Sequence, residues 1–429
     1  MPGLPTCSPV GFGRHPSAPY PYVPYAGELN SQFNPIIIML VGYLEKLNKP
    51  HALDHAVKEA YQKSTKLMNT FNITGANSFL KFANDLLRWI PHESSEGKDV
   101  YNILCIFYFV FNQHPLKDIQ TPITPDVVGQ PLTWLSSWLV VYSQLVGQWM
   151  DTRDSLTAES LETFRQSPAY SMDEAEEPSG GWKTFNELFA RSLKPGSRPI
   201  ADPDDDTVIV YPADCRYDTS LEYHSVSISS TGTVLIKGLP WTISSLLQGS
   251  EFGDYFNGGV WMHAFLNAYN YHRQHAPVAG KVLEAKVVQG TCYLEVNDDG
   301  EPQRTIIGPG LQATEDYKIQ APDTPGYQFL QTRGIIVIEN DTLGKVAVLP
   351  IGMALVSGVK LSVSAGQELK KGDEISNFLF GGSDIICVFE KKANLTPDCF
   401  VSSPDPPEEE PWNNYSKYGT KLAKAEPQA

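Results

Sequence analysis

The sequence predicts an α+β fold, in which an N-terminal all-α region is followed by a mainly β region. Between residues 28 and 170, apolar side chains recur every three or four positions, which is the spacing of amphipathic helices. After Pro195-Gly196, short β-branched and aromatic runs alternate with glycine and proline, a pattern typical of strands and turns. A chain of 429 residues is long enough for two or three domains with buried cores.

The helical region begins at Asn34-Pro35, an N-cap residue followed by proline at the first helical position, and a helix is predicted from Ile36 to Leu47. Further apolar stripes predict helices over 53–71, 79–87 and 134–149. No chemical motif accompanies the aromatic residues of these stripes, so we interpret them as a core rather than as a cofactor pocket.

The β region opens with Thr184 and Glu187, whose spacing is that of a capping box, so we expect a helix there. Short helices are also expected from Thr242 to Leu247 and before His272. Strands are expected at 207–211, 233–236, 281–288, 334–338 and 345–351.

Composition divides the chain into five segments: a disordered N-terminus at 1–27, a helical domain at 28–170, an acidic linker at 171–181, a β-rich domain at 182–400 and an acidic, proline-rich tail at 401–429. The tail is expected because the prolines and acids between Ser402 and Pro411 cannot form a core.

Charge and cysteine content limit the function classes. A formal charge of -16 argues against nucleic acid or an anionic membrane surface as a partner. The six cysteines show no CxxC pair and no spacing of a zinc site, so no metal site is predicted and a reducing, cytoplasmic setting is expected. We find neither a targeting signal nor a run of about 18 apolar residues, so no stable membrane anchor is expected.

Gly381-Gly382-Ser383 stands between two strand-like runs within 377–390, where paired glycines mark a break in a strand. From the residues alone, this is a hairpin turn with an incidental serine. Similarly, Asp214 could be a turn carboxylate and His275 a packed histidine. His272 and His275 would share one face of a helix, but a metal pair there lacks further ligands.

Four motifs occur in an order that resembles the phosphatidylserine decarboxylase family: Trp182 to Ile200, Tyr211-Pro-Ala-Asp-Cys215, Tyr271-His-Arg-Gln-His-Ala-Pro-Val-Ala-Gly280 and Gly381-Gly-Ser383. The resemblance covers about half the chain and implies a family-like catalytic domain at 182–400. It also implies a self-cleaving enzyme whose covalent pyruvoyl cofactor is made from a serine. The helical extension is most similar to soluble fungal members that resemble tryptophan decarboxylases.

Carried over from the family, the chain would be cut between Gly382 and Ser383, the pyruvoyl precursor. His275 would be the base, Asp214 would orient it, and His272 would handle substrate or protons. The pieces 1–382 and 383–429 would stay associated, and a homodimer is a possible assembly.

The expected chemistry is an attack of the serine hydroxyl on the preceding carbonyl, followed by β-elimination of the ester and loss of ammonia. Two departures from the family pattern bear on it. Cys215 replaces a glycine, and Asp384 follows Ser383 where serine or threonine is usual. A negative charge at Asp384 could raise the pKa of a nearby histidine or oppose the developing oxyanion.

The first hypothesis is therefore a pyruvoyl-dependent decarboxylase of a small-molecule L-amino acid, with tryptophan or another aromatic amino acid as first choice. Phosphatidylserine is the alternative substrate. A serine hydrolase would use the same residues, but the Gly-x-Ser-x-Gly motif is absent. An unprocessed binding protein is the third hypothesis, since Gly366 to Asp373 is similar to turns of lipoyl carrier folds.

Overall fold

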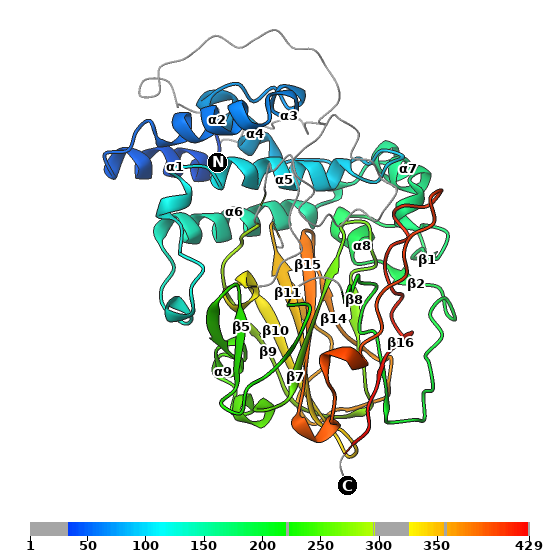
Figure 1. The fold of residues 1–429 in the computed structure, drawn as a ribbon. Coiled ribbons are helices and arrows are strands. Elements are labelled where there is room, and N and C mark those ends of the chain that lie inside the picture. The colour runs from blue at the N-terminus through cyan, green and yellow to red at the C-terminus, as the bar shows by residue number, and fades with distance from the viewer. Residues whose placement is uncertain (1–32, 220–222, 295, 297–325, 356–357, 428–429) are drawn as a thin grey trace, which may run out of the picture.

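The computed structural model describes residues 33–219, 223–294, 296, 326–355 and 358–427, and the disordered segment predicted at 1–27 lies outside them. Figure 1 shows the N-terminal helices as a layer above the ends of the strands, with the sheets below. The α+β class predicted from the sequence is confirmed.

The helical layer begins as the sequence predicts, because the Asn34 side chain accepts a hydrogen bond from the Ile36 N–H at 3.1 Å. The helix predicted over 53–71 is divided, since Ser64 leaves the helical conformation with φ −139°. The described helices of the layer are α1 (Pro35–Lys46), α2 (Ala52–Lys63), α3 (Thr65–Thr70), α4 (Ala76–Leu86), α5 (Asp99–Phe111), α6 (Trp134–Met150) and α7 (Ala158–Gln166), with 3-10 turns at Lys117–Ile119, Pro125–Val127, Arg153–Ser155 and Pro168–Tyr170.

The main sheet is antiparallel and has seven strands in the order β13-β9-β10-β11-β15-β7-β4. Its strands are β4 (Ser225–Ser227), β7 (Val260–Leu266), β9 (Gly280–Val288), β10 (Arg333–Asn340), β11 (Gly344–Met353), β13 (Glu368–Leu369) and β15 (Gly382–Phe389). Strand β15 is interior, and Ser383 lies opposite Gly352 of β11 and Leu266 of β7. The predicted strands of this sheet at 281–288, 334–338 and 345–351 are confirmed.

Smaller sheets surround the main one. A three-stranded sheet has the order β12-β14-β8, and three further sheets are the pairs β16-β3, β5-β6 and β1-β2. Their bounds are β1 (Ala175–Glu176), β2 (Ser192–Leu193), β3 (Val208–Val210), β5 (Thr233–Ile236), β6 (Leu239–Thr242), β8 (Arg273–His275), β12 (Val359–Leu361), β14 (Glu374–Phe378) and β16 (Lys421–Lys424). Short helices α8 (Phe185–Phe189) and α9 (Ile243–Leu246) and 3-10 turns at Gly253–Phe256, Tyr327–Phe329, Lys391–Ala393 and Pro397–Cys399 complete the described elements.

Successive side chains of β15 point to opposite faces of the main sheet. Ile385 and Cys387 belong to a core that is continuous with the apolar side chains of the helical layer. Ile386 and Val388 belong to a second core, formed on the other face with α9 and its neighbouring strands. The strand is therefore buried on both faces.

The helical layer contacts the β region directly beside the Gly-Gly-Ser motif. The Phe380 ring is fully buried and lies 5.7 Å from Trp89 of the helical layer and 5.5 Å from Phe185 of α8. Farther along, the Tyr108 hydroxyl donates to the Cys292 carbonyl at 3.3 Å. These contacts hold the helices against the end of the sheet where β15 begins.

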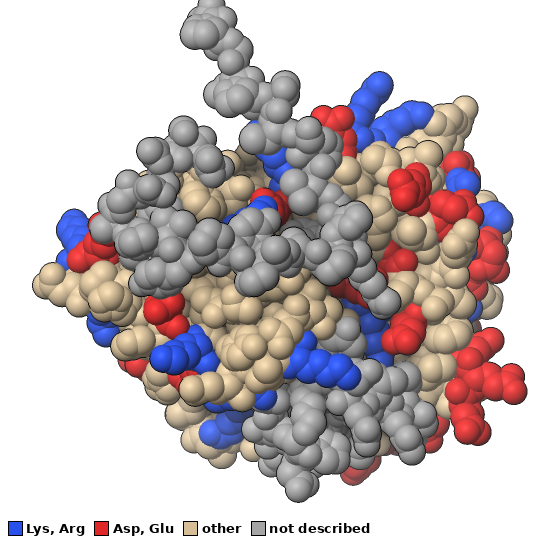
Figure 2. Space-filling model, turned by 90° about the horizontal axis from the view of Figure 1, so that it is seen from above, with Lys and Arg blue, Asp and Glu red and all other residues tan. Residues whose placement is uncertain are grey.

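None of the helices in the described ranges is long and apolar enough to cross a lipid bilayer. Figure 2 shows the molecule from the side of the helical layer, and basic and acidic side chains are interspersed on its visible described surface.

The linker predicted at 171–181 and the tail predicted at 401–429 differ from solvated segments. Strand β1 pairs with β2, and β16 pairs with β3, so both segments add strands to the β region. The acidic run 405–410 is exposed as its composition indicates, but Tyr415 and Leu422 beyond it are buried. Aromatic and aliphatic residues after Pro411 explain the difference, because they find apolar partners in the domain.

We predict that Phe380→Ala lowers the free energy of unfolding by about 3–5 kcal/mol, because it leaves a cavity among fully buried rings. Chemical denaturation in a Ser383→Ala background, which keeps the chain in one piece, measures this change. Leu379→Ala is the matched control, since Leu379 is only half-buried. Equal losses in the two variants would contradict the role given to the Phe380 contacts.

Candidate active site around Ser383

Gly381 and Gly382 form a corner between two sheets rather than a hairpin turn. Strand β14 belongs to the three-stranded sheet, whereas β15 belongs to the seven-stranded sheet. Gly381 has φ 145°, a conformation that other residues rarely adopt. The corner is held from the helix side, because the Asn186 side chain of α8 accepts the Phe380 N–H at 2.9 Å. The chain thus enters β15 at a fixed angle, and Ser383 follows at once.

The Ser383 side chain is fully buried and hydrogen-bonded to a histidine. Its Oγ lies 3.2 Å from Nδ1 of His272. Nε2 of the same ring lies 3.2 Å from the Ala268 carbonyl, which can only accept a hydrogen bond. Nε2 therefore carries the ring proton, and the lone pair of Nδ1 accepts the Ser383 hydroxyl proton. This pair can remove the proton of Ser383.

The surroundings of His272 keep its ring neutral. The ring is fully buried and stacks on Phe189 with a centroid distance of 4.0 Å. The pKa of His272 is lowered to about 3, mainly by burial and in part by the positive charge of Arg191. The Arg191 guanidinium is itself buried and donates to the carbonyls of Tyr170 and Tyr269.

The structure brings Ser383 to His272 but not to His275, to which the family resemblance assigned the base. Nδ1 of His275 lies 2.8 Å from the Gly372 carbonyl, and its Nε2 lies 3.1 Å from the Tyr271 hydroxyl. His275 belongs to β8, and His272 directly precedes that strand, so the two rings do not share a helical face as one interpretation of their spacing assumed. Alternation along an extended chain separates them instead.

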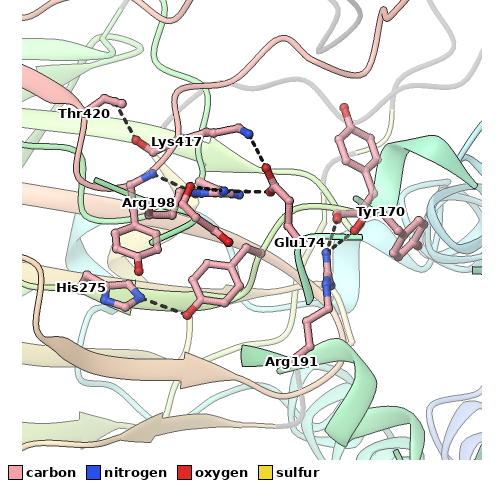
Figure 3. A network of polar contacts seen from close by, with 12 residues as sticks. Tyr170, Glu174, Arg191, Arg198, His275, Lys417 and Thr420 are labelled. Carbon is pink, nitrogen blue, oxygen red and sulfur yellow. Dashed lines mark hydrogen bonds and ion pairs between the residues drawn. The ribbon is translucent and has the colours of Figure 1, made fainter. Parts of the chain in front are cut away.

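Asp214, the expected orienting acid, is paired with an arginine. Its carboxylate accepts from Nε of Arg198 at 3.1 Å and from Nη2 at 2.6 Å. Figure 3 shows this arginine continuing to Glu174, which contacts Lys417. Among the described residues, the carboxylate of Asp214 makes no hydrogen bond to His275. Its negative charge nevertheless raises the pKa of that histidine, against a larger lowering by burial.

Asp384 points to the opposite face of the sheet from Ser383. Its Oδ2 accepts from the Tyr327 hydroxyl at 3.2 Å and from the Gln328 amide at 2.9 Å, and lies 3.2 Å from Nε2 of His263. Oδ1 is buried and has no hydrogen-bond partner in the described part of the chain. These three partners were not found from the sequence, since only the pairing of β7 with β15 brings His263 to this place.

A sequence model of the family described as phosphatidylserine decarboxylase matches residues 185–404, half of the chain. The chain belongs to this family. Its order of motifs, from α8 to the Gly-Gly-Ser corner, therefore carried the correct family assignment. Proenzymes of the phosphatidylserine decarboxylase family have a covalently bound pyruvoyl group that is formed from a serine.

Curated relatives of this chain are named for more than one decarboxylase activity. The chain is 32% identical over 251 residues to phosphatidylserine decarboxylase proenzyme 3 of Schizosaccharomyces pombe, covering 58% of this chain and 23% of that protein. It is 26% identical to decarboxylase iboD of Amanita muscaria, covering 62% and 77% of the two chains. It is 29% identical to L-tryptophan decarboxylase of Psilocybe cyanescens, covering 48% and 46%. The chain spans a fifth to a third of the length of the first curated relatives.

The described parts of the chain contain no candidate metal site. No group of three or more histidine, cysteine, aspartate or glutamate side chains among these residues could hold a metal ion.

We predict that His272 does not titrate between pH 5 and 8 and keeps its proton on Nε2. The reason is the burial that lowers its pKa to about 3. Nitrogen-15 NMR of the Ser383→Ala protein across this pH range measures both the protonation state and the tautomer. A midpoint near the ordinary histidine value of about 6.5 would contradict the buried, neutral ring.

Proposed function

We propose that this chain is a pyruvoyl-dependent decarboxylase that cleaves itself between Gly382 and Ser383 and converts an L-amino acid into its amine and carbon dioxide. Our first choice of substrate is tryptophan or another aromatic amino acid. The observation that carries the proposal is the buried hydrogen bond between Ser383 Oγ and His272 Nδ1, placed directly after the glycine corner. Membership of the family supplies the reaction class.

Self-cleavage needs a base for the serine hydroxyl and an unhindered carbonyl before it. His272 is neutral and has its Nδ1 lone pair on the Ser383 hydroxyl, so it can take the proton as Oγ attacks the Gly382 carbonyl carbon. Gly382 has no side chain to obstruct that attack. Because the protonated form of His272 is disfavoured by burial, the ring would pass the proton on to the departing nitrogen of Ser383.

The residues around position 383 suit a pyruvoyl group. A carbonyl there would act as the electron sink that the loss of carbon dioxide requires. Position 383 is held in an interior strand between β7 and β11, so the same pairing would keep the piece 383–429 attached to 1–382. His275 retains 6% exposure, whereas His272 has none. We therefore assign His275 and its Tyr271 partner to proton transfer with the substrate.

A small pocket stands apart from the Ser383–His272 pair, since neither residue lines it. It lies between the helical layer and the β region and is lined by Gln120, Thr121, Ile123, Ser136, Thr291, Cys292, Tyr293, Tyr327 and Leu330. Tyr327 lines this pocket, and its hydroxyl donates to Asp384 on the face of the sheet opposite Ser383. The choice of an amino acid as substrate is supported instead by the relative named L-tryptophan decarboxylase.

Arg191 is suited to bind an anionic group of the substrate. Its guanidinium has 4% exposure, its Nε has no partner, and no carboxylate pairs with it among the described residues. Its charge is close enough to lower the pKa of His272. A buried cation without an acid favours binding of an anion. Every α-amino acid carries a carboxylate, and phosphatidylserine, the alternative substrate, carries a phosphate as well.

A serine hydrolase receives less support. The Ser383 hydroxyl is fully buried, and its backbone is paired on both sides within the main sheet. The serine of an α/β-hydrolase stands instead on an exposed turn between a strand and a helix.

The cytoplasmic location that we propose is supported by Cys292, Cys387 and Cys399, whose thiols form no disulfide among the described residues.

We predict that the purified chain separates into pieces 1–382 and 383–429, the second with the mass of a pyruvoyl terminus, and that Ser383→Ala stays intact. His272→Gln is expected to slow cleavage by about 10²–10⁴-fold, because it removes the proton acceptor. His275→Gln, whose ring does not contact Ser383, is the matched control and should slow cleavage less than tenfold. Intact-mass spectra over time measure both rates. A wild-type chain that remains whole would remove the pyruvoyl mechanism.

We predict that Arg191→Met raises the KM for the amino acid by about 10–100-fold, because a charged hydrogen bond is worth about 1.5–3 kcal/mol. Arg191→Lys keeps the charge and should recover part of the loss. Release of carbon dioxide from tryptophan and from phosphatidylserine vesicles is measured in parallel, so that the two substrates are distinguished. An unchanged KM for both would exclude Arg191 from substrate binding.

A further inference from the structure

Residues 415–424 form a strap across the β region, and they lie beyond residue 404, where the match to the family model ends. Backbone hydrogen bonds join Ser416 to Cys215 in both directions, at 2.9 and 3.1 Å. The Gly419 N–H donates to the Tyr211 carbonyl at 3.0 Å, and β16 at the end of the strap pairs with β3. The strap therefore follows the segment that contains Asp214.

The strap holds the Asp214 carboxylate. The backbone N–H of Tyr418 donates to Asp214 Oδ1 at 2.9 Å. Lys417 Nζ lies 2.6 Å from Glu174, and Glu174 lies 2.8 Å from Arg198, the arginine that pairs with Asp214. Figure 3 shows Lys417, Glu174 and Arg198 in this succession. Two neighbouring strap residues thus reach the same carboxylate, one directly and one through two side chains.

The strap also covers the His275 ring. The Tyr418 ring stacks on it with a centroid distance of 3.7 Å and an interplanar angle of 2°. The ring edges are fixed by the Gly372 carbonyl at Nδ1 and the Tyr271 hydroxyl at Nε2. A carbonyl only accepts, so Nδ1 carries the proton and Nε2 accepts from Tyr271. Tyr271 also stacks on the ring at 5.7 Å with an interplanar angle of 25°, so Tyr418 supplies the nearer and flatter contact, which sets the plane in which both hydrogen bonds can form.

We propose that the strap is a positioning element of the active site, in which Tyr418 fixes the ring of His275 with its side chain and the carboxylate of Asp214 with its backbone. The inference rests on the proposed function insofar as His275 moves a proton to or from the substrate. Tyr418 itself does not touch Ser383, so its effect is exerted through His275.

The aromatic face of Tyr418, rather than its hydroxyl, carries this role. No hydrogen bond from that hydroxyl occurs within the described residues, whereas the ring contacts both His275 and Tyr271. Tyr418→Phe keeps the face and the backbone N–H. Tyr418→Leu keeps apolar bulk without the flat face, and Tyr418→Ala removes both. These three variants separate ring stacking from simple filling of space.

The charged groups that face His275 are known from the structure. Glu374 and Asp214 raise its pKa and Arg273 lowers it, while burial is the largest influence and also lowers it. Loss of the Tyr418 ring admits water to the imidazole and reduces the effect of burial. The pKa of His275 is therefore expected to rise toward its ordinary value in Tyr418→Ala and Tyr418→Leu, and to stay low in Tyr418→Phe.

The test combines two measurements. Nitrogen-15 NMR titration of His275 in the uncut Ser383→Ala chain measures the pKa and tautomer without any need for activity. In the chain with Ser383, kcat for amino-acid decarboxylation should fall at least tenfold in Tyr418→Ala and Tyr418→Leu with KM within threefold, and Tyr418→Phe should match the wild type. Thermal unfolding of each variant shows whether it folds.

The outcomes separate the two proposals. An uncleaved wild-type chain overturns the proposed function, while the His275 titration still tests the strap. A titration and kcat that are unchanged in Tyr418→Leu overturn the strap inference and leave the proposed function standing. Tyr418→Phe that loses activity as Tyr418→Ala does would also overturn it, because the aromatic face would then not be the feature that matters.

Discussion

A hydroxyl buried in the middle of a sheet must find a hydrogen-bond partner, and much of the site follows from this requirement at Ser383. The partner is Nδ1 of His272, which can accept only if the ring is neutral and its proton lies on the other nitrogen. The Ala268 carbonyl fixes that tautomer, and the stacked Phe189 ring excludes water. These contacts fix the relative positions of the glycine corner, helix α8 and the segment before β8.

Two buried acids near the site are stabilised in different ways. Asp214 is neutralised by the guanidinium of Arg198, which makes it part of an ion-pair network. Asp384 depends on the Tyr327 hydroxyl, the Gln328 amide and the His263 imidazole, and its other oxygen has no partner among the described residues. Because Asp384 points away from the face that carries Ser383, its charge and the serine hydroxyl are on opposite sides of the sheet. The sequence predicts that the Asp384 charge opposes the oxyanion that develops beside Ser383. This repulsion is weakened because the pleat of the strand places the two groups on opposite faces.

The sequence predicted those features that depend on local spacing. The Asn34 cap, the Thr184 cap and the apolar strands of the main sheet follow from short-range spacing that can be read directly. The reciprocal half of the capping box at Thr184 does not form, because the Glu187 side chain accepts from the Lys183 N–H instead. It could not show that β14 and β15 enter different sheets, since both sides of the glycine pair look like the arms of a hairpin. The composition predicts a solvated tail where the strap lies, because the acidic run before it dominates that segment, whereas β16 pairs with β3.

Of the residues that the sequence puts forward for the site, the structure pairs only His272 with Ser383. His275 contacts Gly372 and Tyr271 instead, so the histidine that contacts the serine is the one given the lesser role. Two histidines three residues apart are equivalent as sequence, and only the direction of β8 distinguishes them. The partners of Asp384 came from strand register, which a single sequence does not contain.

Because residue 383 is buried, a chain terminus at this position is tolerated best when it carries no charge. Ordinary hydrolysis before Ser383 would create an α-ammonium group inside a strand that is covered on both faces. A charge in such a place is costly unless an acid pairs with it, and the carboxylate of the adjacent residue, Asp384, lies across the sheet. A pyruvoyl end carries no charge. The chemistry that makes the terminus reactive is thus also the chemistry that allows it to remain in the interior.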